Sequence, residues 1–192
     1  PSALRVAGGH GPSLVPEPYL LGGFDVVVRG DGGEALLDLA ENTGNIARIR
    51  SLPNISTRSE TGFIHNPLRA QTKNLDKYPY PLQERECHTL IDKDQVRNNV
   101  DPLEFQAGMY SLVIGRGCIG KCTYCTSGTW DEMYKESHCK LLKRRNRSVA
   151  HIMGELERNQ HRAKTVFFQD DHFAFPTRQA FGLVRTYKET IN

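Results

Sequence analysis

The stretch MYSLVIGRGCIGKCTYC, residues 109–125, joins the pattern of a β-strand to a cluster of cysteines. Its first half is apolar, contains β-branched residues and ends in glycines, which is typical of a buried strand that runs into a loop. Its second half places Cys118, Cys122 and Cys125 at a CxxxCxxC spacing. The chain has five cysteines, an odd number, so this spacing indicates metal or redox chemistry and not a disulfide framework.

The number of clustered cysteines narrows the kind of site. Thiolates ligate iron–sulfur clusters, and four cysteines usually close a [4Fe–4S] cluster. Three cysteines leave one iron open to bind a substrate or cofactor. Two alternatives use the same residues: a structural zinc site with Cys139 or His138 as a further ligand, and a closed electron-transfer cluster with Cys139 as its fourth ligand.

The residues after the cysteines continue an α/β pattern. Ser148 is expected to cap a helix whose apolar face is formed by Val149, Ile152, Met153 and Leu156. A strand over residues 165–169 and a helix over residues 177–187 follow. The order strand, loop, helix, strand, helix is how a parallel barrel or open sheet begins.

The residues before the strand divide into two parts. Residues 1–45 contain the apolar run LRVAGG, a strand over residues 25–29, a glycine-rich turn and a helix over residues 34–41, as in a parallel α/β sheet. Residues 46–105 are rich in proline, asparagine and charged residues, which predicts a linker with a small hairpin around residues 62–65. Residues 106–192 then form the second α/β part.

Composition excludes some classes of partner. The net charge of +3 is too small to indicate a nucleic-acid partner, and the basic run at residues 140–147 is expected to be a solvated surface. No apolar run approaches the ~18 residues of a membrane span. No signal-peptide pattern is visible, so we expect a cytoplasmic protein.

The run Cys118-Ile-Gly-Lys-Cys122-Thr-Tyr-Cys125 resembles the signature of the radical S-adenosylmethionine (SAM) superfamily. The resemblance implies that the three cysteines hold a [4Fe–4S] cluster after the first strand of a (β/α) barrel. It also implies that the open iron binds the amino and carboxylate groups of SAM. One electron then cleaves SAM to a 5′-deoxyadenosyl radical. Tyr124, an aromatic residue before the third cysteine as in the family, would lie near the adenine.

Asp170 and Asp171 end the strand at residues 165–169. Carboxylates at this strand end can hold an ammonium group, and in the family this position contacts the amino group of SAM. The usual glycine–glycine–glutamate motif is replaced here by QDDHF, and a DDxF version is familiar among cobalamin-associated members. The alternative is that the pair caps the following helix.

The N-terminal part is similar to the C-terminal half of the Rossmann-like cobalamin-binding domain of those members. The similar stretches are VAGGHGPSLVPE (residues 6–17), FDVVVRGDGGEALLDLAE (24–41) and the linker NLDKYPYP (74–81). Gly8, Gly9, Gly30 and Gly33 would let the backbone approach a bulky ligand at the strand ends. The DxHxxG motif that supplies a cobalt ligand is absent from the chain, and His10 does not fit it. The prediction of cobalamin binding therefore depends on the resemblance alone.

The resemblance implies a cobalamin-dependent radical SAM enzyme, with methyl transfer to an unactivated centre as the leading reaction. Cyclisation or rearrangement, a non-catalytic electron carrier and a zinc-binding module are the alternatives. The substrate, a small molecule or a peptide, is not specified by the residues, and a flavodoxin or ferredoxin would supply electrons. Residues 106–192 hold about two of the β/α units of a ~250-residue barrel, so we expect an inactive fragment.

Overall fold

A computed structural model describes residues 3–84, 86, 88–170 and 177–191 of the chain. The chain divides into two compact units, and each unit consists of two stretches of sequence. The first unit contains residues 1–72 and 119–143, and the second contains residues 73–118 and 144–192. The chain therefore passes between the units three times, and one of these passages directly follows Cys118.

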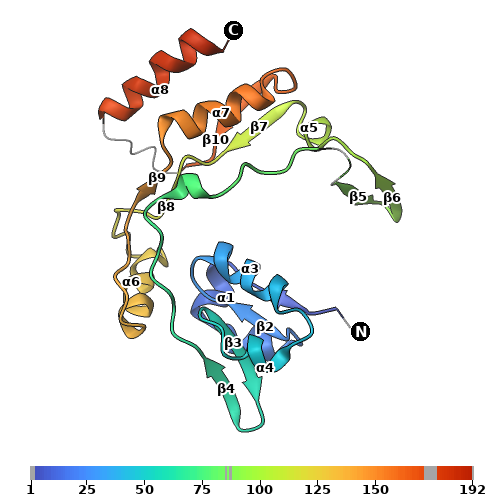
Figure 1. Cartoon of the computed structure of the whole chain (residues 1–192), viewed down its shortest axis with the longest axis vertical. Coiled ribbons are helices and arrows are strands. Elements are labelled where there is room, and N and C mark those ends of the chain that lie inside the picture. The colour runs from blue at the N-terminus through green and yellow to red at the C-terminus, as the bar shows by residue number, and fades with distance from the viewer. Residues whose placement is uncertain (1–2, 85, 87, 171–176, 192) are drawn as a thin grey trace. The chain divides into compact units, whose positions relative to one another are not determined.

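The first unit is built on a mixed sheet in the order β1-β2-β3-β4. Strands β1 (Val6–Ala7) and β2 (Val26–Val28) are parallel, β3 (Ile55–Ser59) is antiparallel to β2, and β4 (Gly62–His65) forms a hairpin with β3 (Figure 1). The helices of this unit are α1 (His10–Leu14), α2 (Pro16–Leu21), α3 (Gly32–Glu41), α4 (Ile46–Ile49) and α6 (Ser127–Glu136). Every residue of β2 is buried, and Ala35 and Leu39 of α3 belong to the same core cluster.

The first unit extends beyond residue 45, into the segment that was expected to be a linker. The hairpin expected around residues 62–65 is present, but its partner strand β3 also adds to the edge of the sheet at β2. Strand β3 escaped recognition because two of its buried residues, Ser56 and Thr57, are polar. The Ser56 hydroxyl is satisfied by the ring of His65, at 2.9 Å from Nδ1. A strand with buried polar residues lacks the apolar alternation that pattern reading needs.

The second unit contains a parallel pair of strands, β7 (Met109–Leu112) and β10 (Thr165–Phe168), as predicted. Helices α7 (Val149–Asn159) and α8 (Thr177–Thr190) pack with them (Figure 1). The buried core of this layer consists of Leu103, Tyr110, Leu112, Ile114, Ile152, Met153, Leu156 and Leu183. The Ser148 hydroxyl accepts a hydrogen bond from the backbone N–H of His151 at 3.1 Å, which confirms the predicted helix cap.

The second unit also contains several smaller helices and strands, which lie in the chain before and between the strands and helices of this core. They are the 3₁₀-helix η1 (Leu75–Lys77), the hairpin β5 (Thr89–Asp92) and β6 (Gln95–Asn98), helix α5 (Pro102–Phe105), and the antiparallel pair β8 (Gly115–Arg116) and β9 (Arg145–Asn146). The expected strand over residues 109–117 is divided, because its first part pairs with β10 and its second part with β9.

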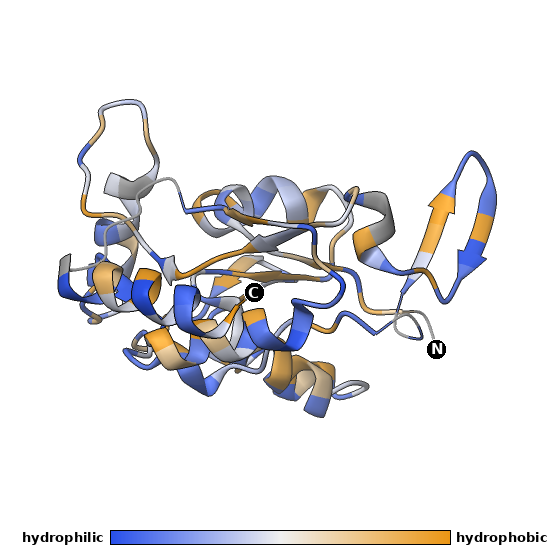
Figure 2. Cartoon of the chain, turned by 90° about the horizontal axis from the view of Figure 1, so that it is seen from above, coloured by the Kyte–Doolittle hydropathy of each residue, from blue (hydrophilic) through white to orange (hydrophobic). Residues whose placement is uncertain are grey.

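Figure 2 shows hydrophobic residues on both strands of the β5–β6 hairpin, which extends to the right in that view. Ile91 and Val96 pair across this hairpin and are 74% and 64% exposed. In the described part of the chain, no helix combines the length and the apolar character that crossing a membrane requires.

A buried charge network joins β7 to α7. The Tyr110 hydroxyl donates a hydrogen bond to Glu155 at 2.6 Å, and Glu155 forms an ion pair with Arg147. Glu155 is 1% exposed. Burial and the neighbouring Glu155 carboxylate raise the pKa of Tyr110 well above its ordinary value. The carboxylate thus ties the strand to the helix from inside the core.

We expect Glu155→Gln to lower the free energy of unfolding by about 3 kcal/mol, because the Arg147 guanidinium would stay buried without its counter-charge. Glu157, exposed on the same helix, offers the matched control: Glu157→Gln should change stability by less than ~0.5 kcal/mol. Urea unfolding followed by circular dichroism measures both. Equal effects of the two substitutions would contradict a structural role for the buried pair.

Candidate functional site

Strands β8 and β9 form the base of the segment that carries the cysteines. Gly115 pairs with Asn146 and Arg116 pairs with Arg145, so the chain leaves β8 and returns to the same place at β9. All three clustered cysteines lie between these two strands in the sequence. The two-stranded pair therefore sets where the cysteine segment begins and ends.

The carboxylate of Asp170 holds this base at the carboxyl end of β10. Its Oδ2 accepts a hydrogen bond from the backbone N–H of Ile114 at 2.8 Å, and its Oδ1 accepts one from Gly115 at 3.0 Å. Arg144 Nη2 lies 3.0 Å from Oδ1, and Arg144 Nη1 donates to the carbonyl oxygen of Gly117 at 3.2 Å. The side chains of Asp170 and Arg144 are 1% and 12% exposed. One buried ion pair thus holds the backbone on both sides of β8, up to the residue before Cys118. We call Asp170 and Arg144 the Asp–Arg clamp.

Gly115 is required by the Asp–Arg clamp because Arg144 crosses its backbone at close range. A Cβ atom on residue 115 would lie 2.8 Å from Arg144 Cζ and 2.5 Å from Asn146 Oδ1. Both distances are shorter than real Cβ contacts allow, so any larger residue would displace the arginine. The glycine of the GRGC run therefore has a packing reason independent of any cofactor.

The three clustered cysteines are all exposed. Cys125 donates a backbone hydrogen bond to the carbonyl oxygen of Cys122 at 3.2 Å, so these two share one turn. Among residues 3–84, 86, 88–170 and 177–191, no three histidine, cysteine, aspartate or glutamate side chains converge in a metal-binding arrangement. The gathering of the three thiolates around one cluster therefore stays a prediction, although exposed thiols in a short loop suit iron–sulfur ligation.

Cys139 is placed differently from the other three. It is half-buried beside Leu68, Met133 and Tyr134, and its thiol donates to the carbonyl oxygen of Leu68 at 3.3 Å. This packing gives Cys139 a structural role in the first unit. The alternatives in which Cys139 or His138 completes a zinc site, or Cys139 closes an iron–sulfur cluster, stay predictions.

The structure describes two of the three residues predicted to contact SAM, Tyr124 and Asp170. Tyr124 is 90% exposed, so its ring is accessible, and its contact with an adenine stays a prediction. Both carboxylate oxygens of Asp170 have protein partners in the Asp–Arg clamp, which the sequence did not indicate. Its contact with an amino group also stays a prediction. Asp171 lies outside the described residues.

The predicted cofactor glycines of the first unit have different surroundings. Gly8 and Gly9, after β1, and Gly33, in the first turn of α3, are exposed. Gly30 instead has a packing reason for its identity: its φ is +74°, and a Cβ atom would lie 2.7 Å from the hydroxyl of Tyr134. Tyr134 is fully buried and accepts a hydrogen bond from the backbone N–H of Asp31 at 3.2 Å. Helix α6, distant in sequence, therefore imposes the glycine.

The basic run at residues 140–147 is only in part the solvated surface that was expected: Lys140 and Lys143 are exposed, and the three arginines are not. Arg145 is 6% exposed, and the side chains of Arg144 and Arg147 are each 12% exposed. Strand β9 brings these residues to β8, and two of them find carboxylate partners in Asp170 and Glu155. Sequence reading missed them because the partners lie later in the chain and at no helical or strand spacing.

We expect Asp170→Asn to lower the free energy of unfolding by about 3 kcal/mol and to speed amide exchange at Ile114 and Gly115. Arg144 would lose its buried counter-charge, and an amide offers one acceptor where the carboxylate offers two. Hydrogen–deuterium exchange with site resolution reads the local effect. Asp25→Asn, which breaks the exposed pair with Arg5, should cost less than ~1 kcal/mol and leave these amides protected. Unchanged exchange in Asp170→Asn would disprove the Asp–Arg clamp.

Gly30→Ala should destabilise the chain by at least ~2 kcal/mol, because it adds a steric clash with Tyr134 to backbone strain. Gly44→Ala is the matched control, since Gly44 also has a positive φ of +90° but no atom within 4 Å of the added Cβ. Its cost should be near 1 kcal/mol. Urea midpoints that fall equally in the two variants would show that strain alone operates at residue 30.

Comparison with known proteins gives solved structures as the only matches. No protein-family model and no curated protein matches the chain. Among solved structures, it is similar to the radical S-adenosylmethionine methyltransferase TsrM from Kitasatospora setae with cobalamin and a [4Fe–4S] cluster bound. The identity is 21% and the TM-score 0.62, over 96% of this chain and 33% of TsrM. It is also similar to the cobalamin-dependent S-adenosylmethionine radical enzyme OxsB with aqua-cobalamin and S-adenosylmethionine bound. Here the identity is 18% and the TM-score 0.63, over 98% of this chain and 24% of OxsB.

These likenesses concern the fold. The chain is a mixed α/β protein with parallel and antiparallel strand pairs, and it has the fold of a part of cobalamin-dependent radical SAM enzymes. This confirms, at the level of fold, the resemblance that the cysteine run and the N-terminal stretches indicated. The chain spans about a third of the length of TsrM and about a quarter of that of OxsB.

Proposed function

We propose that the chain is part of a cobalamin-dependent radical SAM enzyme that transfers a methyl group to an unactivated centre. One observation carries this proposal: the CxxxCxxC segment follows the carboxyl end of the parallel strand β7, in a chain that shares its fold with TsrM and OxsB over nearly its full length. Ligands of α/β proteins bind at the carboxyl ends of parallel strands, which supports a site that begins after β7.

In this proposal Cys118, Cys122 and Cys125 hold a [4Fe–4S] cluster and leave its fourth iron to SAM. When bound, the cluster supplies the electron that cleaves SAM to a 5′-deoxyadenosyl radical. The chain itself orients the site. The Asp–Arg clamp holds the backbone up to Gly117, and Tyr124 presents an exposed ring for the adenine. Asp170 and Asp171 are the proposed carboxylates for the amino group of SAM, and Asp170 also serves in the Asp–Arg clamp.

Cobalamin is assigned to the first unit, as part of a Rossmann-like domain. Its sheet begins with the parallel strands β1 and β2, and exposed glycines follow β1 and begin α3. Gly9 has no atom within 4 Å of the position of a Cβ, so backbone near residues 8 and 9 is open to a large ligand. Gly8, Gly9 and Gly33 remain the candidates for contact with cobalamin, and Gly30 is better explained by Tyr134.

The partners follow from the chemistry of the proposed reaction. Reductive cleavage of SAM needs one electron, which we assign to a flavodoxin or ferredoxin in the cytoplasm. The methyl acceptor is a small molecule or a peptide. Cyclisation or rearrangement would use the same cluster and the same SAM site, so the methyl transfer rests on the likeness to TsrM, a methyltransferase.

The test is anaerobic reconstitution of the chain with iron and sulfide. We expect about four irons and four sulfides per chain. Serine at Cys118, Cys122 or Cys125 should abolish the cluster. Cys139→Ser is the matched control and should retain it, because the half-buried Cys139 thiol already donates to the carbonyl oxygen of Leu68. Loss of the cluster in Cys139→Ser, or binding of zinc in place of iron, would favour a closed cluster or a zinc-binding module.

Electron paramagnetic resonance of the reduced cluster tests the open iron. Addition of SAM should change the spectrum, because its amino and carboxylate groups would enter the coordination sphere of the fourth iron. A cluster with the expected iron content and a spectrum unchanged by SAM would identify an electron carrier and refute the radical mechanism.

A further inference from the structure

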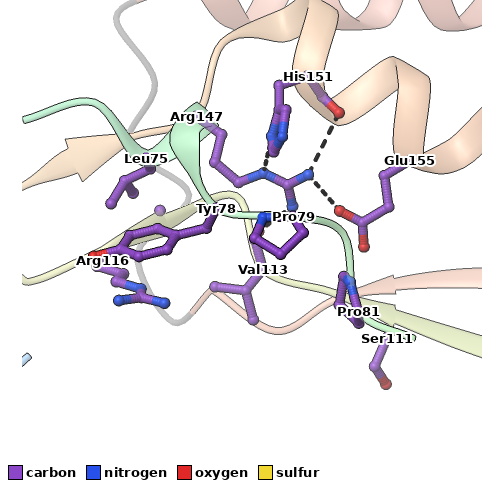
Figure 3. A pocket seen from close by; sticks show the side chains of 11 residues that line it. Leu75, Tyr78, Pro79, Pro81, Ser111, Val113, Arg116, Arg147, His151 and Glu155 are labelled. Atoms are coloured by element: carbon purple, nitrogen blue, oxygen red, sulfur yellow. Dashed lines mark hydrogen bonds and ion pairs between the residues drawn. The ribbon is translucent and has the colours of Figure 1, made fainter. Parts of the chain in front are cut away.

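The second unit contains a hollow of about 330 Å³ beside the free edge of β7 (Figure 3). The segment from Leu75 to Pro81 forms one wall, β7 and β8 form a second, and α7 forms the third. Its size is at the lower end of small-molecule sites, which measure roughly 300–1,000 Å³. It has room for one ring with a short side chain. None of the residues assigned to the cluster, SAM or cobalamin lines it.

At the wall formed by α7, the charges of Glu155 and of Arg147, which precedes the helix, offset each other. Arg147 forms an ion pair with Glu155, and its Nη1 donates to the carbonyl oxygen of Val113 at 3.0 Å. Its Nε donates to His151 Nδ1 at 2.9 Å, so this ring nitrogen acts as an acceptor. Figure 3 shows these three side chains directed at one another. Their hydrogen-bonding capacity is largely used within the protein.

The opposite end of the hollow carries an uncompensated positive charge at Arg116. Its guanidinium lies 5.0 Å from the ring centre of Tyr78, and the Lys77 ammonium lies 5.2 Å from the same ring. None of the described carboxylates forms an ion pair with Arg116. A guanidinium stacked on an aromatic ring keeps its N–H groups in the plane of the fork, where they match the two oxygens of a carboxylate.

The remaining lining is apolar and flat. Pro79, Pro81 and Val113 line the hollow between Arg116 and α7, and Val113 is 49% exposed. Pyrrolidine rings and a branched aliphatic side chain favour the face of a ring over a flexible polar chain. The hollow thus combines one cationic end with one apolar slot.

We propose that this hollow binds a small aromatic carboxylate, with its carboxylate on Arg116 and its ring against Pro79 and Val113. The site is separate from the proposed cluster chemistry and needs neither iron nor SAM. Its ligand is a molecule with a single ring and one acidic group, because Arg116 is the lining cation without an ion pair to any described carboxylate, and the hollow has little further volume.

Isothermal titration calorimetry of the full chain without iron tests the proposal, with phenylacetate as the probe. Phenylacetamide removes only the charge, and acetate removes only the ring. We expect phenylacetate to bind at least ~10-fold more tightly than either, since a charge-assisted contact and a buried ring are each worth about a factor of ten. Absence of phenylacetate binding at roughly 10 mM would overturn the proposal.

The variants Arg116→Gln and Arg48→Gln form a matched pair. Arg116→Gln should weaken phenylacetate binding ~10-fold or more and leave phenylacetamide unaffected. Arg48, exposed on α4 in the first unit, should be replaceable without effect on binding. Circular dichroism checks that both variants are folded. Equal affinity of phenylacetate and phenylacetamide, or an unchanged affinity in Arg116→Gln, would disprove the assignment of Arg116.

Discussion

The buried carboxylate of Asp170 is the constraint on which the candidate site depends. It stands at the carboxyl end of β10, and its two oxygens accept backbone hydrogen bonds from Ile114 and Gly115 at the point where β7 gives way to β8. A carboxylate that is 1% exposed needs a counter-charge, and Arg144 provides it. Because Arg144 also holds the carbonyl oxygen of Gly117, the position of the chain before Cys118 follows from the second parallel strand. The place at which the cysteine segment begins, up to Cys118, is therefore a property of the fold of the second unit.

A second buried carboxylate with an arginine counter-charge stabilises another part of this unit. Glu155 is buried between Tyr110 and Arg147, and Arg147 in turn donates to the carbonyl oxygen of Val113, directly after the end of β7. Among the described strands, β7 pairs only with β10, so its other edge has no strand partner. Two buried carboxylates thus fix the two ends of one arginine-rich stretch, Arg144 at Asp170 and Arg147 at Glu155. The hollow lined by Arg116 lies beside this edge.

In the first unit, sequence-distant residues determine which glycine is free to serve a ligand. Tyr134 of α6 approaches Gly30 so closely that no side chain fits there, whereas a Cβ on Gly9 would meet no atom within 4 Å and one on Gly8 only ordinary contacts with Val28. The glycines of this unit therefore occur for two different reasons. At residue 30 a side chain of the same unit packs closely against the backbone, whereas after β1 the backbone is exposed. The cobalamin assignment depends only on the second reason.

The sequence by itself determined the α/β class, the parallel strands around residues 109–112 and 165–168, the helix that Ser148 caps, and the candidate ligands Cys118, Cys122 and Cys125. These features depend on short-range periodicity and spacing, which are written along the chain. Only the tertiary structure decided that β3 completes the first sheet, that Asp170 binds backbone and Arg144, and that Tyr134 imposes Gly30. Each of these depends on a partner 26 to 104 residues away in sequence (from Arg144 to Asp170, and from Gly30 to Tyr134). Burial makes such pairings necessary, because a buried charge or polar group must be satisfied, but no local pattern names the residue that satisfies it.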